Sequence, residues 1–450
     1  MRRRTGGWWD AVLVYGQPRM LSMLALGFSS GLPFMLIYST LSAWLRQAGI
    51  ERATIGMLSW VSLVYTLKFL WAPVVDRLRL PLIGALLGQR RSWMLLAQAG
   101  IACALIALSA SDPSTRVAHV ALLALLLAFA AATQDVAIDA WRIESAPVRE
   151  QGAMAAAYQL GYRVAILVGS AGALWLAADA GFRYCYGAMA ALIGIGVLTT
   201  LLVREPERAA PLQSVLTQQR VLDWLASRGH WPGWLRRGGA WIFGAVICPV
   251  LDFFTRFGLS LGLLMFAFIS TYRLTDFTMG TMANRFYLDL GFSLREIAAV
   301  AKIFGTAWTV AGILFGGFAV ARLGRVRSLL LGSALVIISN VGYSILAAHG
   351  TPSIPGLATV ISLDNFAQGV HGTALIAFLS SLTSASFTAT QYAVLSSLYS
   401  LLPKLLMGTS GLVVDAIGYP PFYLYTASLS IPALLLLYVL SRRRDFRTLV

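Results

Sequence analysis

Residues 117–143 read VAHVALLALLLAFAAATQDVAIDAWRI, an apolar run whose polar residues gather near its end. In an α-helix, about 20 apolar residues cross the roughly 30 Å hydrocarbon core of a bilayer. This stretch can therefore span a membrane, and Gln134, Asp135 and Asp139 would then lie within the span. A charge at that depth is costly unless it faces a water-filled path or an opposite charge. The segment predicts an integral membrane protein with a polar route through it.

The rest of the chain has the same character. Of its 450 residues, 58% are hydrophobic and only 12% are charged, which is too little polar surface for a water-soluble protein of this size. Apolar runs of spanning length recur, so we predict an all-α integral membrane protein with about 12 transmembrane helices. The predicted spans lie near residues 20–45, 54–75, 92–110, 117–143, 152–178, 183–203, 257–287, 294–321, 327–348, 355–383, 388–415 and 419–441.

The net charge of +16 is explained by where the cations lie. Most lysines and arginines fall in loops on the N-terminal side of the predicted spans, and the positive-inside rule assigns that side to the cytoplasm. An even number of spans places both termini there. The cations are scattered over short loops without a nucleic-acid-binding module, so we predict no nucleic-acid partner. The first apolar run, from Leu21, is too long for a signal peptide and should remain as the first span.

The longest polar stretch, residues 204–256, divides the chain into two predicted six-helix halves, 1–203 and 257–450. Within this linker, Trp241 to Leu251 is apolar but too short to cross a bilayer, so we expect an interfacial helix.

The two halves resemble each other at an offset of about 240 residues, as duplicated transporter halves do. A duplicated fold predicts a substrate path between the halves. The matched residues are Trp44, Gly49 and Ile55 with Phe286, Gly291 and Ile297, and Gly169, Gly172, Asp179 and Gly181 with Gly408, Gly411, Asp415 and Gly418.

Two carboxylates stand out in the fourth predicted span. Asp135 and Asp139 are four residues apart and share a helix face, where such a pair can share one proton. Reversible protonation is what a proton-coupled carrier requires. The alternative is that Asp139 pairs with Arg142, three residues further on, and only anchors the helix.

Cations also lie inside the predicted spans. All three lysines of the chain, Lys68, Lys302 and Lys404, do so, and burying such a charge costs roughly 2.5–3.5 kcal/mol. In the fifth span Gln159 and Arg163 share a face, with Arg163 close to mid-membrane. A guanidinium there can clamp a substrate carboxylate or neutralise an aspartate of the fourth span. For the lysines, structural ion pairs or snorkelling to the interface are the alternatives.

The second half also has polar and ionisable residues inside its predicted spans. Tyr272, Arg273 and Asp276 lie midway along the seventh predicted span, and Asp364 and Asn365 lie in the tenth. Arg273 and Asp276 either neutralise each other or face the central path. Polar groups of both signs in both halves suit a zwitterionic or anionic polar substrate.

Two loops resemble the Gly/Asp/Arg-rich loops of major facilitator proteins, which latch the two halves together. They follow the second and eighth predicted spans, and Ala321 replaces an expected aspartate in the second loop. The candidate gating residues are Asp76, Arg77, Arg90 and Arg91 in the first loop, and Arg322 and Arg325 in the second.

Several segments in both halves resemble the muropeptide permeases of the AmpG type. The resemblance implies a monomeric major facilitator protein of the bacterial inner membrane, without cofactor or metal. It implies proton-driven import of anhydro-muropeptides, GlcNAc-anhydroMurNAc with or without peptide, for peptidoglycan recycling, and a link to β-lactam resistance. The segments are Gly27 to Pro33, Lys68 to Pro73, Thr133 to Asp135, Asp139 to Trp141, Gly161 to Arg163, Tyr272 to Asp276, Asn365 with Phe366, and Thr388 to Ala393.

The same resemblance suggests a role for each site residue. Asp135 and Asp139 become proton-coupling candidates. Asp364 stands where a glutamate is expected and Lys404 where an arginine is common, so charge is kept but reach differs. The expected substrate-binding residues are Lys68, Gln134, Gln159, Arg163, Tyr272, Arg273, Asp276, Asp364, Asn365 and Lys404.

Two other functions remain open. Related permeases carry acetyl-CoA or other organic anions, and a polytopic membrane enzyme is a different class altogether. Against an enzyme, the four histidines are scattered and no nucleophile lies beside a base. The three cysteines, Cys103, Cys185 and Cys248, are widely spaced in apolar segments, so we expect neither a disulfide nor a zinc site.

Overall fold

The computed structural model describes residues 16–51, 54, 58, 61, 63–147, 150–207, 212–228, 231–300, 304–443 and 446. Within these ranges every regular element is helical, which confirms the predicted all-α class. Cys103, Cys185 and Cys248 are free thiols. No cluster of potential metal ligands occurs among the described side chains.

Where it is described, the first half contains three short helices and five long helical segments. The first and fourth of the long segments are each continued through a π-helical turn. The elements are α2 (Pro18–Met35) with a π turn (Leu36–Thr40) and α3 (Leu41–Gln47), α5 (Leu63–Leu67) with a 3₁₀ turn (Lys68–Leu70) and α6 (Ala72–Arg77), α7 (Ile83–Leu87), α8 (Gln89–Ser109), α9 (Val117–Ser145), α10 (Gln151–Leu167) with a π turn (Val168–Gly172) and α11 (Ala173–Ala180), and α12 (Phe182–Leu202).

The linker and the second half follow. The linker holds α13 (Leu212–Ala226) and a continuous helix made of α14 (Gly233–Ile242), a π turn (Phe243–Ile247) and α15 (Cys248–Phe257). The second half consists of α16 (Leu259–Tyr272), α17 (Leu274–Asp289), α18 (Leu294–Ala299), α19 (Gly305–Leu323), α20 (Arg325–His349), α21 (Ile354–Leu382), α22 (Thr388–Leu406) with a 3₁₀ turn (Met407–Thr409) and α23 (Ser410–Ile417), α24 (Tyr419–Ser428) and α25 (Ser430–Arg442).

Ten helices in the described part of the chain are long and apolar enough to cross a membrane. All but one match a predicted span; the exception, Gly233–Phe257, falls in the predicted linker. The predicted spans near 54–75, 257–287 and 355–383 are not among the ten. The first consists of short helices where it is described, the second is broken at Arg273, and the third is a 29-residue helix, α21, that carries several polar residues.

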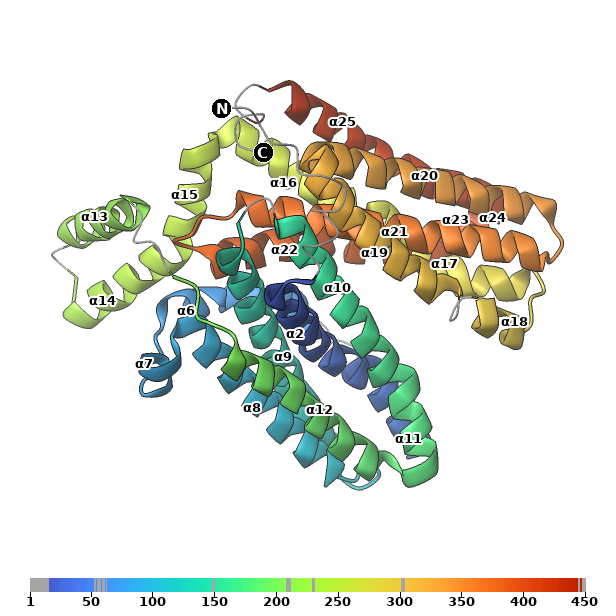
Figure 1. The fold of residues 1–450 in the computed structure, drawn as a ribbon, viewed down its shortest axis with the longest axis horizontal. Helices are drawn as coiled ribbons and strands as arrows, with labels where there is room; N and C mark the ends of the chain where they lie inside the picture. Colours follow the sequence, from blue (N-terminus) through green and yellow to red (C-terminus); the bar gives the residue numbers. More distant parts are fainter. Residues whose placement is uncertain are drawn as a thin grey trace.

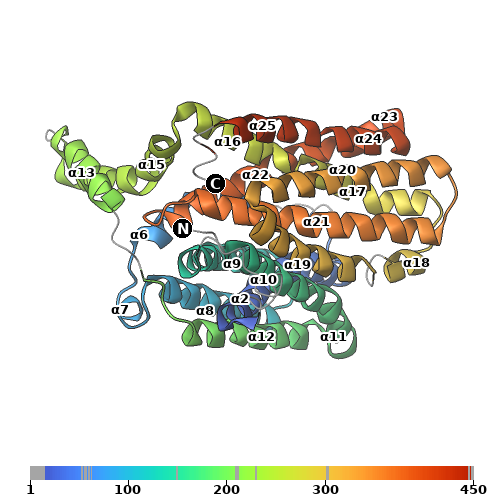
Figure 2. The ribbon, with the colours of Figure 1, turned by 45° about the horizontal axis from the view of Figure 1, so that its top comes forward.

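The two halves meet at one end and separate at the other (Figure 1). We call the end where α2 begins and α25 ends the converging end, and the opposite end the diverging end. Helices α9, α10, α19, α21 and α22 form the contact between the halves. The view in Figure 2 shows the first half lying along one side of the second, with α9 and α10 next to α19 and α21.

The same helix-end geometry occurs in both halves, at positions where the sequence predicted a duplication. Gly49 and Gly291 have positive φ angles of 81° and 98°, which glycine adopts without strain. At both, the glycine N–H donates to the carbonyl three residues earlier and the next N–H donates to the carbonyl five residues earlier. Gly181 and Gly418, with φ of 87° and 77°, likewise each join two helices. Ile55, part of the first match, lies outside the described residues.

Each half has its own apolar core. The first is built around Leu36, Leu105 and Tyr186, and the second around Phe268 and Phe378. A third cluster joins the halves at the converging end, where α22 contributes Ala389 and Ala393. Because each half is stabilised internally, polar side chains can occupy the surface between them.

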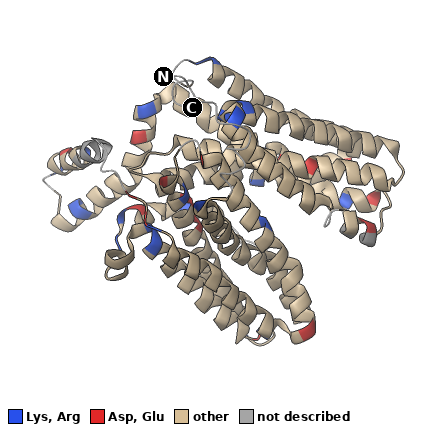
Figure 3. Ribbon diagram, viewed as in Figure 1, with Lys and Arg blue, Asp and Glu red and all other residues tan. Residues whose placement is uncertain are grey.

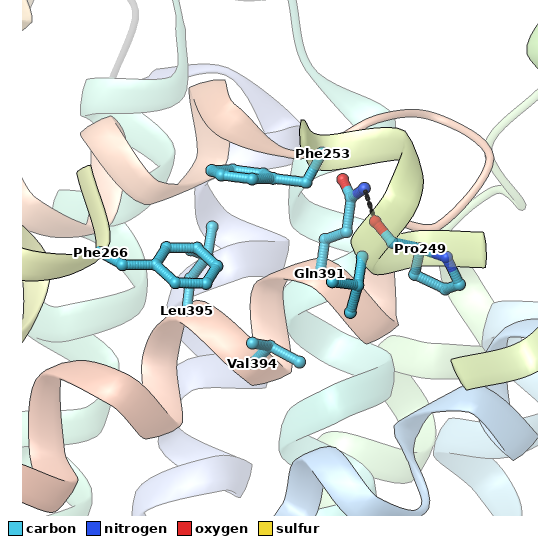
Figure 4. Close-up of a pocket in the computed structure, with 7 residues that line it drawn as sticks. Pro249, Phe253, Phe266, Gln391, Val394 and Leu395 are labelled. Atoms are coloured by element: carbon cyan, nitrogen blue, oxygen red, sulfur yellow. Dashed lines mark hydrogen bonds between the residues drawn. The ribbon is translucent and has the colours of Figure 1, made fainter. Parts of the chain in front are cut away.

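The linker helix α14–α15 contacts the converging end at two places. Near its middle, Gly244 lies against the Arg77 guanidinium, and further on Asp252 Oδ2 accepts a hydrogen bond from Gln391 Nε2 at 2.9 Å. Beside this bond α15, α16 and α22 enclose a small apolar pocket, shown in Figure 4, where Gln391 Nε2 also donates to the Pro249 carbonyl at 2.9 Å. The helix is longer than the apolar stretch 241–251 suggested, and it runs across the bundle end (Figure 1).

Candidate functional site

Polar side chains gather on the last turns of α9, between the halves. Gln134, Asp135, Asp139 and Arg142 are all buried, although α9 is otherwise alanine-rich and apolar. Small alanines let neighbouring helices approach closely, so these polar groups find partners on other helices. The fourth-span motif is therefore a buried polar centre.

Asp135 contacts neutral donors on the described chain. Ser30 Oγ of α2 donates a hydrogen bond to Asp135 Oδ1 at 2.5 Å and lies 2.8 Å from the Tyr158 hydroxyl of α10. The neighbouring Gln134 exchanges two hydrogen bonds with Ser29, so its amide ties α9 to α2. Asp135 is thus a buried carboxylate linked to a hydroxyl chain.

Asp139 is held by two cations. Lys68 Nζ lies 3.6 Å from its Oδ2, and Arg142 Nη2 lies 3.4 Å from its Oδ1. Arg142 reaches into the second half, where its Nη1 donates to Ser380 Oγ at 2.8 Å and its guanidinium lies 5.1 Å from the Tyr392 ring. The anchoring alternative for Asp139 therefore describes this conformation, with Lys68 as a second partner.

In the second half, Asp276 is the centre of a polar cluster. Its carboxylate accepts a hydrogen bond from Arg273 Nε at 2.8 Å and from Gln368 Nε2 at 3.0 Å, and it lies 3.0 Å from His371 Nδ1. Tyr272 donates to the Leu329 carbonyl and packs its ring on His371. Arg273 and Asp276 therefore form a pair, as one alternative predicted, but histidine and glutamine share that pair.

The tenth-span residues hold α21 to its neighbours. Asp364 Oδ1 accepts a hydrogen bond from Ser339 Oγ at 3.2 Å, and Asn365 Oδ1 accepts one from Thr309 Oγ1 at 2.8 Å. Both side chains are only partly buried.

Three further candidates lie where the halves face each other. Arg163 is exposed, has no ion pair within the described chain, and is close enough to Arg273 for the two cations to repel. Lys404 Nζ donates to Thr66 Oγ1 at 2.6 Å and faces Lys68. Gln159 Nε2 donates to Thr373 Oγ1 across the contact at 2.5 Å. Cations of both halves thus face the same region.

The first candidate gating loop closes the converging end. Asp76 accepts hydrogen bonds from the Thr390 amide at 2.6 Å and the Ala389 amide at 3.2 Å, at the start of α22. Arg90 bridges Asp76 and Glu144 at 2.7 and 2.6 Å. An anion at a helix N-terminus is stabilised by the free amides and the helix dipole. The first half is therefore locked to α22.

The other gating candidates lie at the same end. Arg77 lies 5.8 Å from the Phe387 ring, and Arg91 donates to the Thr200 and Leu201 carbonyls. Arg322 and Arg325 flank Gly324, which joins α19 to α20.

Lys302 lies outside the described residues. The structure adds polar partners that sequence reasoning missed, because each belongs to a different helix from the residue it contacts. Ser30 could have been found from the sequence, because it lies in the segment Gly27 to Pro33 that resembles the muropeptide permeases. His371 belongs to no such segment and is one of four scattered histidines. The missed partners are Ser30, Thr66, Glu144, Tyr158, Gln368, His371, Thr373, Ser380 and Thr390.

Comparison with known proteins agrees with this arrangement. Residues 23–403 match the family model of the Major Facilitator Superfamily. The chain is 34% identical over 436 residues to the anhydromuropeptide permease of Escherichia coli K12, covering 96% of this chain and 82% of that protein. It is 30% identical to the putative transporter AmpG 4 of Rickettsia conorii, covering 96% and 98%.

A solved structure shows the same fold. The proton:xylose symporter XylE, bound to 6-bromo-6-deoxy-D-glucose, superposes with a TM-score of 0.64 at 13% identity, covering 96% of this chain and 95% of that one. The predicted architecture of two pseudo-symmetric helical halves is confirmed. This chain therefore belongs to the Major Facilitator Superfamily and, within it, to the family of the anhydromuropeptide permeases.

Proposed function

We propose that this protein imports anhydro-muropeptides, GlcNAc-anhydroMurNAc with or without peptide, across the bacterial inner membrane for peptidoglycan recycling, driven by protons. The observation that carries the proposal is Arg163, an exposed cation without an ion pair in the described chain and near enough to Arg273 of the other half for the two charges to repel. Two guanidinium groups so placed suit a carboxylate, which each binds through charge-assisted hydrogen bonds. A muropeptide carries carboxylates on its peptide, and without the peptide it carries the free lactyl carboxylate of muramic acid.

A cluster of aromatic rings that suits a sugar lies beside this cationic region. The Phe34 ring is 4.5 Å from Tyr38, 5.5 Å from Tyr65 and 6.4 Å from Tyr162, measured between centroids. Tyr65 and Tyr162 are also electrostatic neighbours of Asp135. Aromatic faces stack on the apolar faces of sugar rings. The cluster therefore supports a glycan end next to the proton-coupling carboxylate, and a peptide end next to the arginines.

We assign the converging end to the cytoplasm, with both termini there. Figure 3 shows lysines and arginines gathered at that end, as the positive-inside rule requires. The structure then represents a state with its halves apart toward the periplasm. Import follows when the lock around Asp76 opens while the opposite ends close, as in alternating access.

For proton coupling the two aspartates take different roles. Asp139 already has two cationic partners, so its charge is compensated, whereas Asp135 is buried against hydroxyl groups. Lys68 is an electrostatic neighbour of both aspartates, but the ion pairs within the described chain are made by Asp139, and a buried carboxylate without such a pair holds a proton more readily. Asp135 is therefore the proton carrier, and Asp139 holds Lys68 and Arg142 in place.

We include the domain boundaries in this proposal. Residues 1–203 and 257–450 form the moving halves, and residues 204–256 form a cytoplasmic linker whose helix α14–α15 lies at the membrane interface. We propose a monomer as the working unit. The proposal also includes a link to inducible β-lactam resistance.

The test is uptake of labelled GlcNAc-anhydroMurNAc-tripeptide into proteoliposomes, with and without an inward proton gradient. We expect gradient-driven uptake by the wild type and by Asp112→Asn, a control in an exposed loop, and none by Asp135→Asn. Arg163→Gln should weaken substrate binding about 10- to 100-fold, because it removes a charged hydrogen bond worth about 1.5–3 kcal/mol.

The possible outcomes test the identity of the substrate and the proton coupling separately. Wild-type uptake that ignores the gradient would refute proton coupling alone. Binding of CoA esters in place of muropeptide would move the chain to the organic-anion permeases, because the same cations suit such ligands.

A further inference from the structure

His371 is a buried titratable side chain that the proposed mechanism does not yet use. It lies midway along α21, and its side chain is only 2% exposed, whereas His119 and His349 are exposed at helix ends. Its ring packs on Tyr272 with 3.9 Å between centroids and 31° between planes. Such a histidine is held in one orientation.

His371 and Arg273 contact the same carboxylate oxygen of Asp276. The same oxygen, Asp276 Oδ2, lies 3.0 Å from His371 Nδ1 and 2.8 Å from Arg273 Nε, while Gln368 Nε2 donates to the other oxygen. While His371 is neutral, Arg273 is the only full positive charge in this set, and Asp276 compensates it. A proton on His371 adds a second cation to the same anion.

We infer that His371 is a proton-binding site that controls how strongly Arg273 binds the substrate carboxylate. When His371 is protonated, the imidazolium compensates Asp276, and the Arg273 charge becomes available to an external anion. When His371 loses the proton, Asp276 again neutralises Arg273, and the anion is bound less tightly. Proton binding and anion binding then favour each other, as thermodynamic linkage requires.

The surroundings of His371 support this exchange. Imidazole is the side chain that changes charge between pH 5 and 8. From α17 the ring meets Asp276, which also binds Arg273 at the N-terminus of α17; from α16 it meets Tyr272, and from α20 the small residue Gly332 lies against His371. On α21 itself, Asp364 is an electrostatic neighbour of Asp276. In the described chain, His371 therefore contacts one carboxylate, Asp276, which it shares with the Arg273 guanidinium.

Arg273 lies where its charge, once Asp276 no longer neutralises it, can reach a bound anion. Its side chain is 24% exposed, although Asp276 and His371 are almost fully buried, and it faces Arg163 across the halves. In the proposed import direction, an acidic periplasm protonates His371 and strengthens binding, and a more alkaline cytoplasm removes the proton and releases the substrate. This inference rests on the proposed function for its ligand.

The experiment measures protons taken up when GlcNAc-anhydroMurNAc-tripeptide binds the purified full-length protein. Calorimetry in buffers of different ionisation enthalpy gives this number between pH 5.5 and 8. His371→Asn keeps a neutral donor near the position of Nδ1 but cannot titrate, and His349→Asn is the matched control at an exposed helix end. Linkage to one proton changes the Kd by up to tenfold per pH unit.

We expect proton uptake to fall by up to one per ligand in His371→Asn and to stay at the wild-type value in His349→Asn. Unchanged uptake in a folded His371→Asn protein overturns the inference while leaving the proposed function intact. If the wild type does not bind the muropeptide at any pH, the proposed function fails and the linkage falls with it.

Asp276→Asn provides a second test should His371→Asn not fold. It removes the anion for which both cations compete. The affinity at pH 8 should rise, because Arg273 is no longer neutralised, and proton uptake should fall. Unchanged pH dependence in this variant also overturns the inference.

Discussion

At the scale of single residues, the two aspartates of α9 show how partners decide what a carboxylate does. Asp139 lies within 3.6 Å of Lys68 and 3.4 Å of Arg142, whereas Asp135 accepts a hydrogen bond from Ser30. Removing one partner from a buried ion pair leaves an uncompensated charge and costs about 3–5 kcal/mol. The same substitution should therefore affect the two positions differently.

We expect Asp139→Asn to lower the free energy of unfolding by about 3–5 kcal/mol, because two buried cations lose their anion. Asp135→Asn should cost less than about 1 kcal/mol, since an amide oxygen can still accept from Ser30. Unfolding in detergent with increasing dodecyl sulfate measures both. Adding Lys68→Met to Asp139→Asn should recover part of the loss. Equal losses at both positions would show that Asp135 is also held as an ion pair.

At the scale of helices, α2 and α10 pack with their backbones in contact. A Cβ added at Gly161 would collide with the Leu24 carbonyl oxygen, and one at Gly27 would collide with that of Tyr158. In the second half, a Cβ at Gly312 would meet the Phe366 carbonyl oxygen, so α19 and α21 are equally close. Gly27 and Gly161 let α2 and α10 approach closely, which brings Tyr158 within reach of Ser30 and completes the hydroxyl chain to Asp135.

Gly161→Ala should therefore lower the free energy of unfolding by about 1–3 kcal/mol, since overpacking forces the helices apart. Gly187→Ala on α12 is the control: no atom lies within 4 Å of the added Cβ, and alanine favours a helix over glycine by about 1 kcal/mol. Thermal unfolding in detergent compares the two. If Gly161→Ala were as stable as Gly187→Ala, the close packing of α2 and α10 would not contribute to stability.

At the scale of the whole molecule, the contacts between the halves explain the shape in Figure 1. The Asp76 lock, the Arg142–Ser380 bond and the Gln159–Thr373 bond all join the halves. In the Asp76 lock, a carboxylate binds the N-terminal amides of α22. The linker helix contacts the same part of α22 through Gln391. In the alternating-access mechanism that we propose, the strength of this lock decides how often the converging end opens.

Asp76→Asn should weaken this lock, because an amide carries no charge to stabilise the N-terminus of α22 or to pair with Arg90. We expect faster hydrogen exchange at the amides of Ala389 and Thr390, measured by mass spectrometry on the intact protein in detergent, and slower substrate uptake. Asp179→Asn, an exposed residue at the diverging end, is the control and should exchange like the wild type. Unchanged exchange in Asp76→Asn would mean that other contacts hold the halves together.

The membrane class, most of the spans and the repeat between the halves could be predicted from the amino-acid order. These properties are local, since hydrophobic length, loop charge and glycine spacing are read within a few turns of helix. The sequence also identified the charged residues inside the spans, because a buried charge is conspicuous in an apolar run. It did not show the break at Arg273 or the length of the linker helix, because average hydropathy does not report where the backbone bends.

Which of these residues meet depends on the packing of helices that are far apart in the chain. His371 joins Asp276 across 95 positions, Ser30 joins Asp135 across 105, and Asp76 reaches Thr390 across 314. Helical periodicity tells which face a side chain occupies but not which helix lies opposite. The partners of a buried charge, and hence its protonation and its role, depend on that packing.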